Sequence, residues 1–306
     1  MDRIIAVVGA TASGKTALSI ELAKRLKSEI ISCDSMQIYR HMNIGTAKPS
    51  IAEMSGIVHH MIDIVEPYEN FSCVDYVELA KKCVSEIHSK GKIPIFCGGT
   101  GLYLDSVLSD NIFSDQTSDP ALRDELMAQS PDSLYYQLKS VDPQSAEAIH
   151  PNNIKRVVRA LEIYYSTGKT KTQWDLESRT SDKKYNSVII GLDYRNRETL
   201  YERIDCRVDM MIADGLVDEV RSLDIDRLEV STAGQAIGYK EVIRYLKNES
   251  DFDEMITEIK LNTRRYAKRQ LTWFRRNKNI IWHQRDASEI FNNDIIKFEE
   301  IVNNLF

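Results

Sequence analysis

The sequence predicts an α/β fold of the P-loop NTPase-like kind: a parallel sheet flanked by helices, with an inserted all-helical lobe. Two observations predict this fold. Short apolar runs alternate with longer segments of helical periodicity, which is typical of βαβ units. In addition, residues 9–16 read GATASGKT and match the phosphate-binding pattern GxxxxGK[ST].

The phosphate-binding motif lies in the context that it requires, between an apolar run at residues 4–8 and a segment with helical periodicity. Its glycines allow several backbone N–H groups to face one point, and the following helix N-terminus adds partial positive charge there. We therefore predict an anion site at Gly9, Ala10, Thr11, Ala12, Ser13, Gly14, Lys15 and Thr16. Lys15 can neutralise a terminal phosphate, and Thr16 can ligate Mg²⁺.

Five apolar runs are predicted to be buried strands: residues 4–8, 29–33, 93–97, 188–193 and 279–283. Between residues 114 and 187 the pattern changes. Polar residues dominate there, and four prolines (Pro120, Pro131, Pro143 and Pro151) separate short helical segments. We predict a core domain formed by residues 1–113 and 188–306, interrupted by a helical insertion domain at 114–187.

Composition limits the possible classes of protein. The 306 residues suffice for two lobes, and no apolar run approaches the roughly 20 residues needed to span a bilayer. The five cysteines are widely spaced without a CxxC pair, which argues against a disulfide framework or a zinc site and favours reduced, mostly buried thiols. We expect a cytoplasmic monomer. The net charge of −6 argues against nucleic-acid binding unless basic residues gather locally.

Polar residues follow two of the predicted strands, where parallel sheets place their chemistry. Asp34 follows the run 29–33 and could accept a proton or support a magnesium ion, although an Asx turn would equally explain an aspartate there. Residues 98–101 (GGTG) allow a close backbone approach but are a weak signal alone. His59 and His60 would point to opposite sides of a strand, so we expect structural roles for them.

Basic residues do gather locally. Residues 264–278 contain seven Lys or Arg and no acid, interleaved with Tyr266, Trp273 and Phe274. This pattern suits phosphate contacts and base stacking, but for the aromatics an amphipathic helix that buries Trp273 and Phe274 is the favoured interpretation. A second patch, at residues 155–159, lies in the predicted insertion. Two separate basic faces indicate an extended polyanionic partner.

Arg203 and Arg207 are four residues apart on a predicted helix and therefore share a face. They could supply cations to the phosphate site from across the cleft. Pairing within the helix, with Glu202 or Asp209, is the alternative.

Eight motifs together resemble the bacterial tRNA dimethylallyltransferases, in family order from residue 4 to about 283. They are GATASGKT, DSMQIYR from Asp34, GTAKP from Gly45, HHMIDI from His59, GGTGLY from Gly98, RIDCRVDMM from Arg203, AIGYKE from Ala236 and KRQLTWFR from Lys268. The resemblance implies transfer of a dimethylallyl group from dimethylallyl diphosphate to N6 of the adenosine 3′ to the tRNA anticodon, releasing diphosphate. The P-loop would hold the diphosphate rather than ATP.

The resemblance also implies roles for individual residues. Lys15, Thr16 with Mg²⁺, and Arg207 would stabilise the departing diphosphate, with Arg203 as a further cation beside it, and Asp34 would accept the proton from the amino group. The family's tRNA-contacting positions match Asp34, Ser35, Met36, Gln37, Thr100, Arg123, Lys155, Arg156, Val157, Val158, Arg159, Gln235, Ala236, Ile237, Gly238, Tyr239, Lys240, Lys268, Arg269, Gln270, Leu271, Thr272, Trp273, Phe274 and Arg275. The family often has another residue where Gln235 stands.

Three other functions fit parts of the pattern. A small-molecule kinase would share the P-loop and the acidic residue after the second strand, but it would not need a distant basic face. A related enzyme that prenylates free adenine nucleotides would not need the insertion or the basic segment at 268–278. A non-catalytic RNA-binding module would not need Lys15, Thr16 and Asp34 together.

Overall fold

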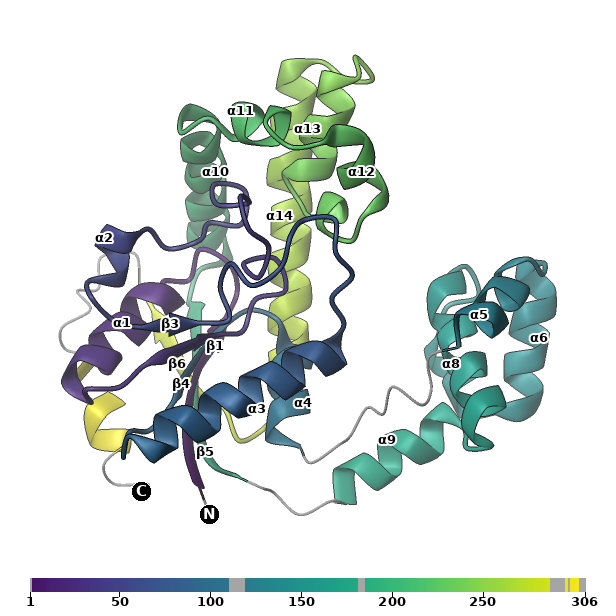
Figure 1. Ribbon diagram of the computed structural model, residues 1–306, viewed down its shortest axis with the longest axis horizontal. Helices are drawn as coiled ribbons and strands as arrows, with labels where there is room; N and C mark the ends of the chain where they lie inside the picture. Colours follow the sequence, from purple (N-terminus) through teal and green to yellow (C-terminus); the bar gives the residue numbers. More distant parts are fainter. Residues whose placement is uncertain (1, 110–118, 181–184, 287–294, 297, 303–306) are drawn as a thin grey trace. The chain divides into compact units, whose positions relative to one another are not determined.

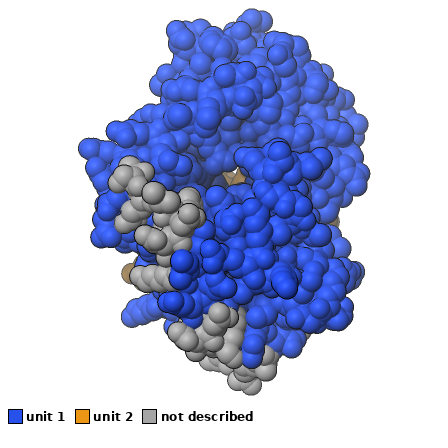
Figure 2. Space-filling model, turned by 90° about the vertical axis from the view of Figure 1, so that its left-hand side faces the viewer, with its two compact units in different colours: residues 1–105, 185–306 blue, residues 106–184 orange. Residues whose placement is uncertain are grey.

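The computed structural model describes residues 2–109, 119–180, 185–286, 295–296 and 298–302. The chain forms two compact units, one of residues 1–105 and 185–306 and the other of residues 106–184 (Figure 2). The boundaries predicted from the sequence were residues 113/114 and 187/188. The first boundary lies at 105/106, and the predicted position 113/114 is outside the described residues. The second boundary lies at 184/185, because the strand after the insertion begins at Tyr185, three residues earlier than the run that starts at Val188.

The larger unit is built on a six-stranded parallel sheet in the order β3-β2-β4-β1-β5-β6. Its strands are β1 (Asp2–Gly9), β2 (Ile30–Ser32), β3 (His59–His60), β4 (Ile95–Gly98), β5 (Tyr185–Tyr194) and β6 (Ile281–Arg285). All five predicted runs form strands, and β3 adds an edge strand of two residues. Residues 4–8 of β1 are at most 2% exposed, as expected for a central strand covered on both faces.

Helices of the larger unit cover the sheet and extend beyond the carboxyl ends of its strands (Figure 1). They are α1 (Lys15–Arg25), α2 (Ile51–Met54), α3 (Cys73–Ser89), α4 (Gly101–Leu108), α10 (Arg197–Ala213), α11 (Leu216–Arg221), α12 (Ile225–Val230), the 3₁₀ turn η2 (Ala233–Gln235), α13 (Tyr239–Leu246) and α14 (Phe252–Phe274). Serine side chains start α2 and α3 in capping boxes, at Ser50 with Glu53 and at Ser72 with Asp75.

Two large apolar clusters lie in the larger unit. One lies under the sheet, where Leu18 and Leu22 of α1 pack on Val7 and Ile190. The other joins α10 to α14 with the segment after β2, around Tyr39, Leu216 and Tyr239. The second cluster therefore holds the helices in place above the strand ends, where parallel sheets bind ligands.

The smaller unit consists of α5 (Pro120–Met127), α6 (Pro131–Val141), α7 (Pro143–Ala148), α8 (Ile154–Thr167) and α9 (Lys171–Thr180) in its described part. Three of the prolines noted in the sequence occupy first positions of helices, where proline costs nothing. Leu134, Leu138 and Leu161 form the centre of a separate apolar cluster. The all-helical prediction for this segment is confirmed for the residues described.

All five cysteines are free thiols, as expected, but only Cys33 is buried and Cys206 is exposed. The expectation that most are buried is therefore wrong. None of the described helices is long and apolar enough to cross a membrane.

Candidate active site

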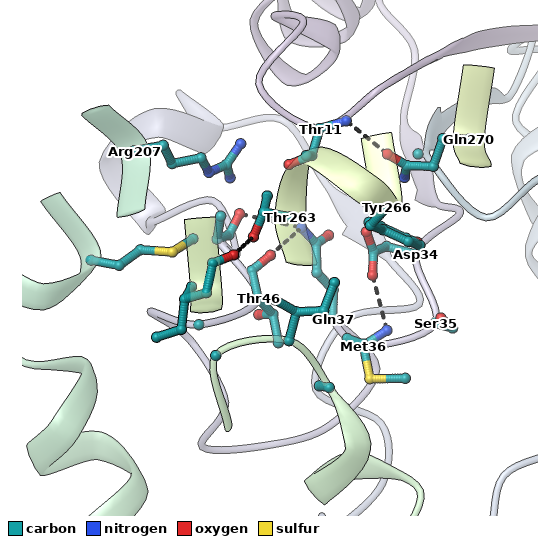
Figure 3. A pocket seen from close by; sticks show the side chains of 18 of the residues that line it. Thr11, Asp34, Ser35, Met36, Gln37, Thr46, Arg207, Thr263, Tyr266 and Gln270 are labelled. Carbon is teal, nitrogen blue, oxygen red and sulfur yellow. Dashed lines mark hydrogen bonds between the residues drawn. The ribbon is translucent and has the colours of Figure 1, made fainter. Parts of the chain in front are cut away.

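A cavity of about 330 Å³ lies in the larger unit, beyond the carboxyl ends of the central strands. It collects segments that are far apart in the sequence: the P-loop, the residues after β2, α10, the turn before α13, and α14 (Figure 3). In Figure 2 the surface of this unit is hollowed near its centre. The lining includes Thr11, Lys15, Thr16, Asp34, Ser35, Met36, Gln37, Gly45, Thr46, Ala47, Arg207, Val208, Met211, Gln235, Ala236, Ile237, Gly238, Lys240, Ile259, Thr263, Tyr266, Arg269 and Gln270.

The P-loop forms one end of this cavity. Gly14, at φ +90°, lies in the left-handed region and begins α1, so Lys15 and Thr16 are at the helix N-terminus. The Lys15 Nζ donates to the Ala10 carbonyl over 2.6 Å. Burial, with a smaller contribution from the Arg207 guanidinium, lowers the pKa of Lys15 from 10.5 to about 8. Burial therefore disfavours the charged form of Lys15, and a bound anion would stabilise that form.

The two arginines of α10 singled out from the sequence, Arg203 and Arg207, have different positions. Arg207 lines the cavity, and burial lowers the pKa of its guanidinium against the attraction of Asp34. Arg203 instead donates from Nε to the Ala12 carbonyl over 3.3 Å and lies over the Tyr194 ring. Pairing with Asp209 does not occur in the described residues, because Asp209 binds Lys260 at 2.6 Å. Of these two side chains, Arg207 faces the cavity and Arg203 is bonded to the P-loop.

Asp34 lies on the opposite wall from Arg207 (Figure 3). Its Oδ1 accepts the Met36 N–H at 2.9 Å, which is the Asx turn considered from the sequence. The same carboxylate also lines the cavity, so Asp34 can form the turn and still be available to accept a proton. The next residue, Ser35, donates its N–H to Thr100 Oγ1 at 3.1 Å. Thr100 therefore fixes the segment that carries Asp34.

The loop after β2 is held by internal hydrogen bonds. Gln37 donates from Nε2 to the carbonyls of Thr46 and Ala47, at 3.4 and 3.3 Å. Glu219, which the sequence analysis missed, accepts the N–H groups of residues 43–45 and the Tyr239 hydroxyl. Gly45 is required here, because a Cβ would lie 2.4 Å from the Tyr239 ring. The GTAKP motif thus supplies loop geometry, and Gln37 and Tyr239 hold that loop from either side.

Helix α14 contributes the last wall, although the basic stretch at its end has several functions. Tyr266, Arg269 and Gln270 line the cavity, while Lys268 and Thr272 are exposed. The Gln270 amide bonds to the backbone of Thr11 and Gly99, so this predicted RNA contact is occupied within the protein.

The remaining residues of this stretch pack within the larger unit. Leu271 and Phe274 are buried, as expected for the amphipathic interpretation. Trp273 is half-buried, donates to Asp105 Oδ2 at 2.8 Å and lies 3.9 Å from the Arg276 guanidinium. Arg275 pairs with the buried Asp193 at 2.7 Å. The aromatics and Arg275 therefore dock α14 on neighbouring elements.

The smaller unit carries the second basic patch on α8. Lys155 and Arg156 are exposed, whereas Val157 and Val158 belong to the core and offer no surface to RNA. Arg123 and Arg159 both pair at 2.9 Å with Glu162, whose side chain is fully buried. One carboxylate thus holds two partly exposed guanidinium groups in fixed orientations. Such oriented, net-positive edges suit phosphate contacts.

The histidine pair has a structural role. His60 Nε2 shares a 2.8 Å hydrogen bond with Glu29, and His59 Nδ1 lies 2.9 Å from the Ile57 carbonyl. Across the residues that the structure describes, no group of three His, Cys, Asp or Glu side chains could hold a metal ion.

Comparison with known proteins identifies the family. The model of the IPP transferase family matches residues 37–277. The chain belongs to the IPP transferase family. The tRNA dimethylallyltransferase of Anoxybacillus flavithermus is 48% identical over 302 residues, covering 98% of this chain and 96% of that protein. The Bacillus subtilis tRNA dimethylallyltransferase is 47% identical over 283 residues, covering 91% and 90%.

Solved structures of the IPP transferase family share the fold. The tRNA isopentenylpyrophosphate transferase of Bacillus halodurans is 42% identical with a TM-score of 0.77, covering 100% of this chain and 97% of that one. A eukaryotic dimethylallyltransferase acting on tRNA is 31% identical with a TM-score of 0.86, covering 99% and 79%. The family resemblance and the P-loop-like fold predicted from the sequence are confirmed.

Proposed function

We propose that this protein transfers a dimethylallyl group from dimethylallyl diphosphate to N6 of the adenosine on the 3′ side of a tRNA anticodon. One observation carries the proposal: Lys15, Arg207 and Asp34 face the same cavity, beside an apolar wall. Phosphate-binding cations, a carboxylate base and room for a short hydrocarbon are the three features that this reaction needs.

The charge of the cavity favours a diphosphate. Four cationic side chains line it (Lys15, Arg207, Lys240 and Arg269), and Asp34 is the one carboxylate among its described lining residues. Negative charge develops on the leaving diphosphate during the reaction, so these cations and the P-loop N–H groups stabilise the transition state more than the substrate.

The apolar wall favours a prenyl donor over ATP. Val208 and Met211 of α10 face the cavity together with Ile259 of α14, and Ile237 lies on the turn before α13. These side chains offer hydrocarbon contacts to a five-carbon group, which the triphosphate and sugar of ATP would not use. The donor's allylic carbon would then lie between the P-loop cations and Asp34.

The reaction balances with residues of this chain. The bond between the allylic carbon and the diphosphate oxygen breaks, and its electron pair leaves with the diphosphate. The N6 lone pair forms the new carbon–nitrogen bond, and the N6 proton passes to the Asp34 carboxylate. Tyr266 lies beside Asp34, and burial raises its pKa, so the phenol remains neutral near the base.

A magnesium ion fits the site. Thr16 lines the cavity next to Lys15 at the start of α1, and hydroxyl, diphosphate and water oxygens are the ligands that Mg²⁺ prefers. When bound, the ion would add positive charge at the leaving group. Lys15 and Arg207 would hold the other diphosphate oxygens.

The acceptor base must leave its stack to enter a cavity of this kind, which costs a few kcal/mol. The exposed basic residues Lys155, Arg156 and Lys268 can supply the phosphate contacts that offset this cost. Ser35, Met36, Gln235 to Gly238 and Lys240 line the cavity and would contact the base and its neighbours. Tyr239, a predicted RNA contact, is buried and bonded to Glu219 instead.

The test is transfer of labelled dimethylallyl groups by the purified protein with magnesium, comparing unmodified tRNA, AMP and ATP as acceptors. We expect label only in tRNA, at the adenosine beside the anticodon. Label in free nucleotides would instead support the adenine-nucleotide prenyltransferase, and ATP consumption without transfer would support the kinase.

Asp34→Asn sharpens this test. The variant keeps the Asx turn, because an amide oxygen still accepts the Met36 N–H, but it cannot take up the proton. We expect kcat to fall by about 10²–10⁴-fold with little change in tRNA affinity. An unchanged kcat would remove Asp34 as the base.

A further inference from the structure

A single amide on α14 joins two loops of the candidate site. Gln270 is 5% exposed; its Oε1 accepts the Thr11 N–H of the P-loop at 2.9 Å, and its Nε2 donates to the Gly99 carbonyl at 3.1 Å. Thr11 and Gly99 follow β1 and β4, which are adjacent in the sheet. The amide thus bridges the ends of neighbouring strands, and Figure 3 shows its bond to Thr11.

The bridge continues to the segment that carries Asp34. Gly99 is bonded to Thr100, whose N–H donates to the carbonyl of Cys33, the residue before Asp34, at 3.0 Å. Thr100 Oγ1 in turn accepts the N–H of Ser35, the residue after Asp34, at 3.1 Å. The Gln270 amide is therefore linked, through the peptide between Gly99 and Thr100, to the residues on either side of Asp34. Buried networks whose members are all satisfied resist deformation.

The backbone at residue 99 is fitted to this amide. A Cβ on Gly99 would lie 1.9 Å from Gln270 Nε2, so only glycine lets the side chain reach its carbonyl. The paired glycines after β4, a weak signal in the sequence, thus have a specific partner. The contacts with Thr11 on one side and Gly99 on the other hold the Gln270 side chain in one position. The side chain can therefore keep the two loops a fixed distance apart.

We propose that Gln270 is a positioning residue, which sets the distance between the donor-binding P-loop and the Asp34 segment rather than contacting tRNA. The inference rests on the proposed function. In transfer chemistry the carbon and nitrogen must approach in line, and a displacement of about 1 Å can cost about 10²-fold in rate. Without the amide, each loop would keep its own conformation, but the distance between the two loops would no longer be fixed.

The test is Gln270→Met, which keeps the side-chain volume and removes both hydrogen bonds. Asn262→Leu is the matched control: it replaces another amide on α14, whose hydrogen bond to Glu241 lies outside the cavity. For Gln270→Met we expect single-turnover transfer about 100-fold slower, with the KM for tRNA within about threefold of the parent value. For Asn262→Leu we expect transfer within about threefold of the parent rate.

Three results would overturn the proposal. Transfer by Gln270→Met within threefold of the parent rate would show that the bridge is dispensable. A raised KM for tRNA with kcat unchanged would make Gln270 an RNA contact. An equal loss in Asn262→Leu would point to the stability of α14, which melting temperatures of all three proteins would report directly.

Binding of inorganic diphosphate, measured by calorimetry, separates this inference from the function on which it rests. If the parent protein transfers no prenyl group, the proposed function fails. The bridge then still predicts that Gln270→Met binds diphosphate about tenfold more weakly than the parent and Asn262→Leu, because the P-loop is less preorganised. Equal affinities would reject the bridge independently of any transfer.

Discussion

Lys15 carries its charge where burial opposes it. The ammonium group lies beside the Arg207 guanidinium, and its pKa of about 8 places its titration within an accessible range. Lysines with unperturbed pKa values near 10.4 show no titration near pH 8. The charged form predominates below about pH 8 and is lost above it. Affinity for a diphosphate should therefore weaken as pH rises through this range.

We predict that the Kd for inorganic diphosphate rises about tenfold between pH 7 and pH 9, measured by calorimetry. Lys15→Arg is the control, because a guanidinium stays protonated throughout and the ligand's own titration affects both proteins equally. The difference between the two pH profiles isolates Lys15. Parallel profiles would mean that Lys15 remains charged to above pH 9.

At this scale the sequence located the residues whose roles follow from local pattern. Lys15 and Thr16 lie in a contiguous motif, and Asp34 follows a strand, so spacing alone placed them. Gln270 was expected to contact tRNA, so its bridge between two loops was not predicted, and Glu219 was not singled out at all. Their partners, Thr11 and Gly45, lie 259 and 174 residues away along the chain, and the roles depend on where helices dock.

A buried carboxylate, Glu29, connects strand β2 with the edge strand β3 and with the segment before β4. Glu29, at the start of β2, shares a hydrogen bond with His60 of the edge strand β3 and accepts from Lys90 and Lys92, which precede β4. Burial acts to raise the pKa of Glu29, but the hydrogen bonds from Lys92, Lys90 and His60 outweigh it and lower the pKa from 4.5 to about 2. The ionised carboxylate therefore stabilises the fold.

We predict that Glu29→Gln lowers the free energy of unfolding by on the order of 3 kcal/mol near neutral pH. Because the folded pKa lies below the unfolded value, this stabilisation is present above about pH 4.5 and is lost as pH falls towards 2. Urea unfolding at pH 7, 5 and 3 should show the difference from the parent protein more than halved at pH 3. Glu78→Gln, which breaks the exposed pair with Lys82, should cost less than about 1 kcal/mol at any pH.

The edge strand illustrates why elements are harder to predict than motifs. β3 has two residues and lacks an apolar run of its own, so periodicity could not identify it as a strand. Its pairing depends on β2 and on the contact between His60 and Glu29. By contrast, β1 is eight residues long with a continuous apolar centre, and it was predicted from sequence alone.

The whole molecule is acidic, yet its functional surfaces are not. The chain has a net charge of −6, while the cavity is lined by four cations and α8 exposes Lys155 and Arg156. Separation of this kind limits non-specific attraction to polyanions and concentrates affinity at particular places. The net charge of the chain therefore says little about its partner, whereas the local basic residues indicate a polyanion.

We predict that Lys155→Ala and Arg156→Ala each weaken tRNA binding and reduce the salt dependence, the slope of log K against log[salt], by about one in magnitude. Filter binding at salt concentrations from about 50 to about 300 mM measures the slope. Affinity for inorganic diphosphate should not change. Lys139→Ala, an exposed lysine on α6 of the same unit, is the control, and an equal change there would mean that α8 is not the contact.

The exposed thiol of Cys206 offers access to the site without disturbing it. Cys206 lies on α10, one residue before Arg207, and does not line the cavity, and it alone among the five described cysteines is exposed. An environment-sensitive dye attached there would leave the cavity-lining side chains intact. Its fluorescence would follow, in real time, how the wall that carries Arg207 responds as each substrate arrives.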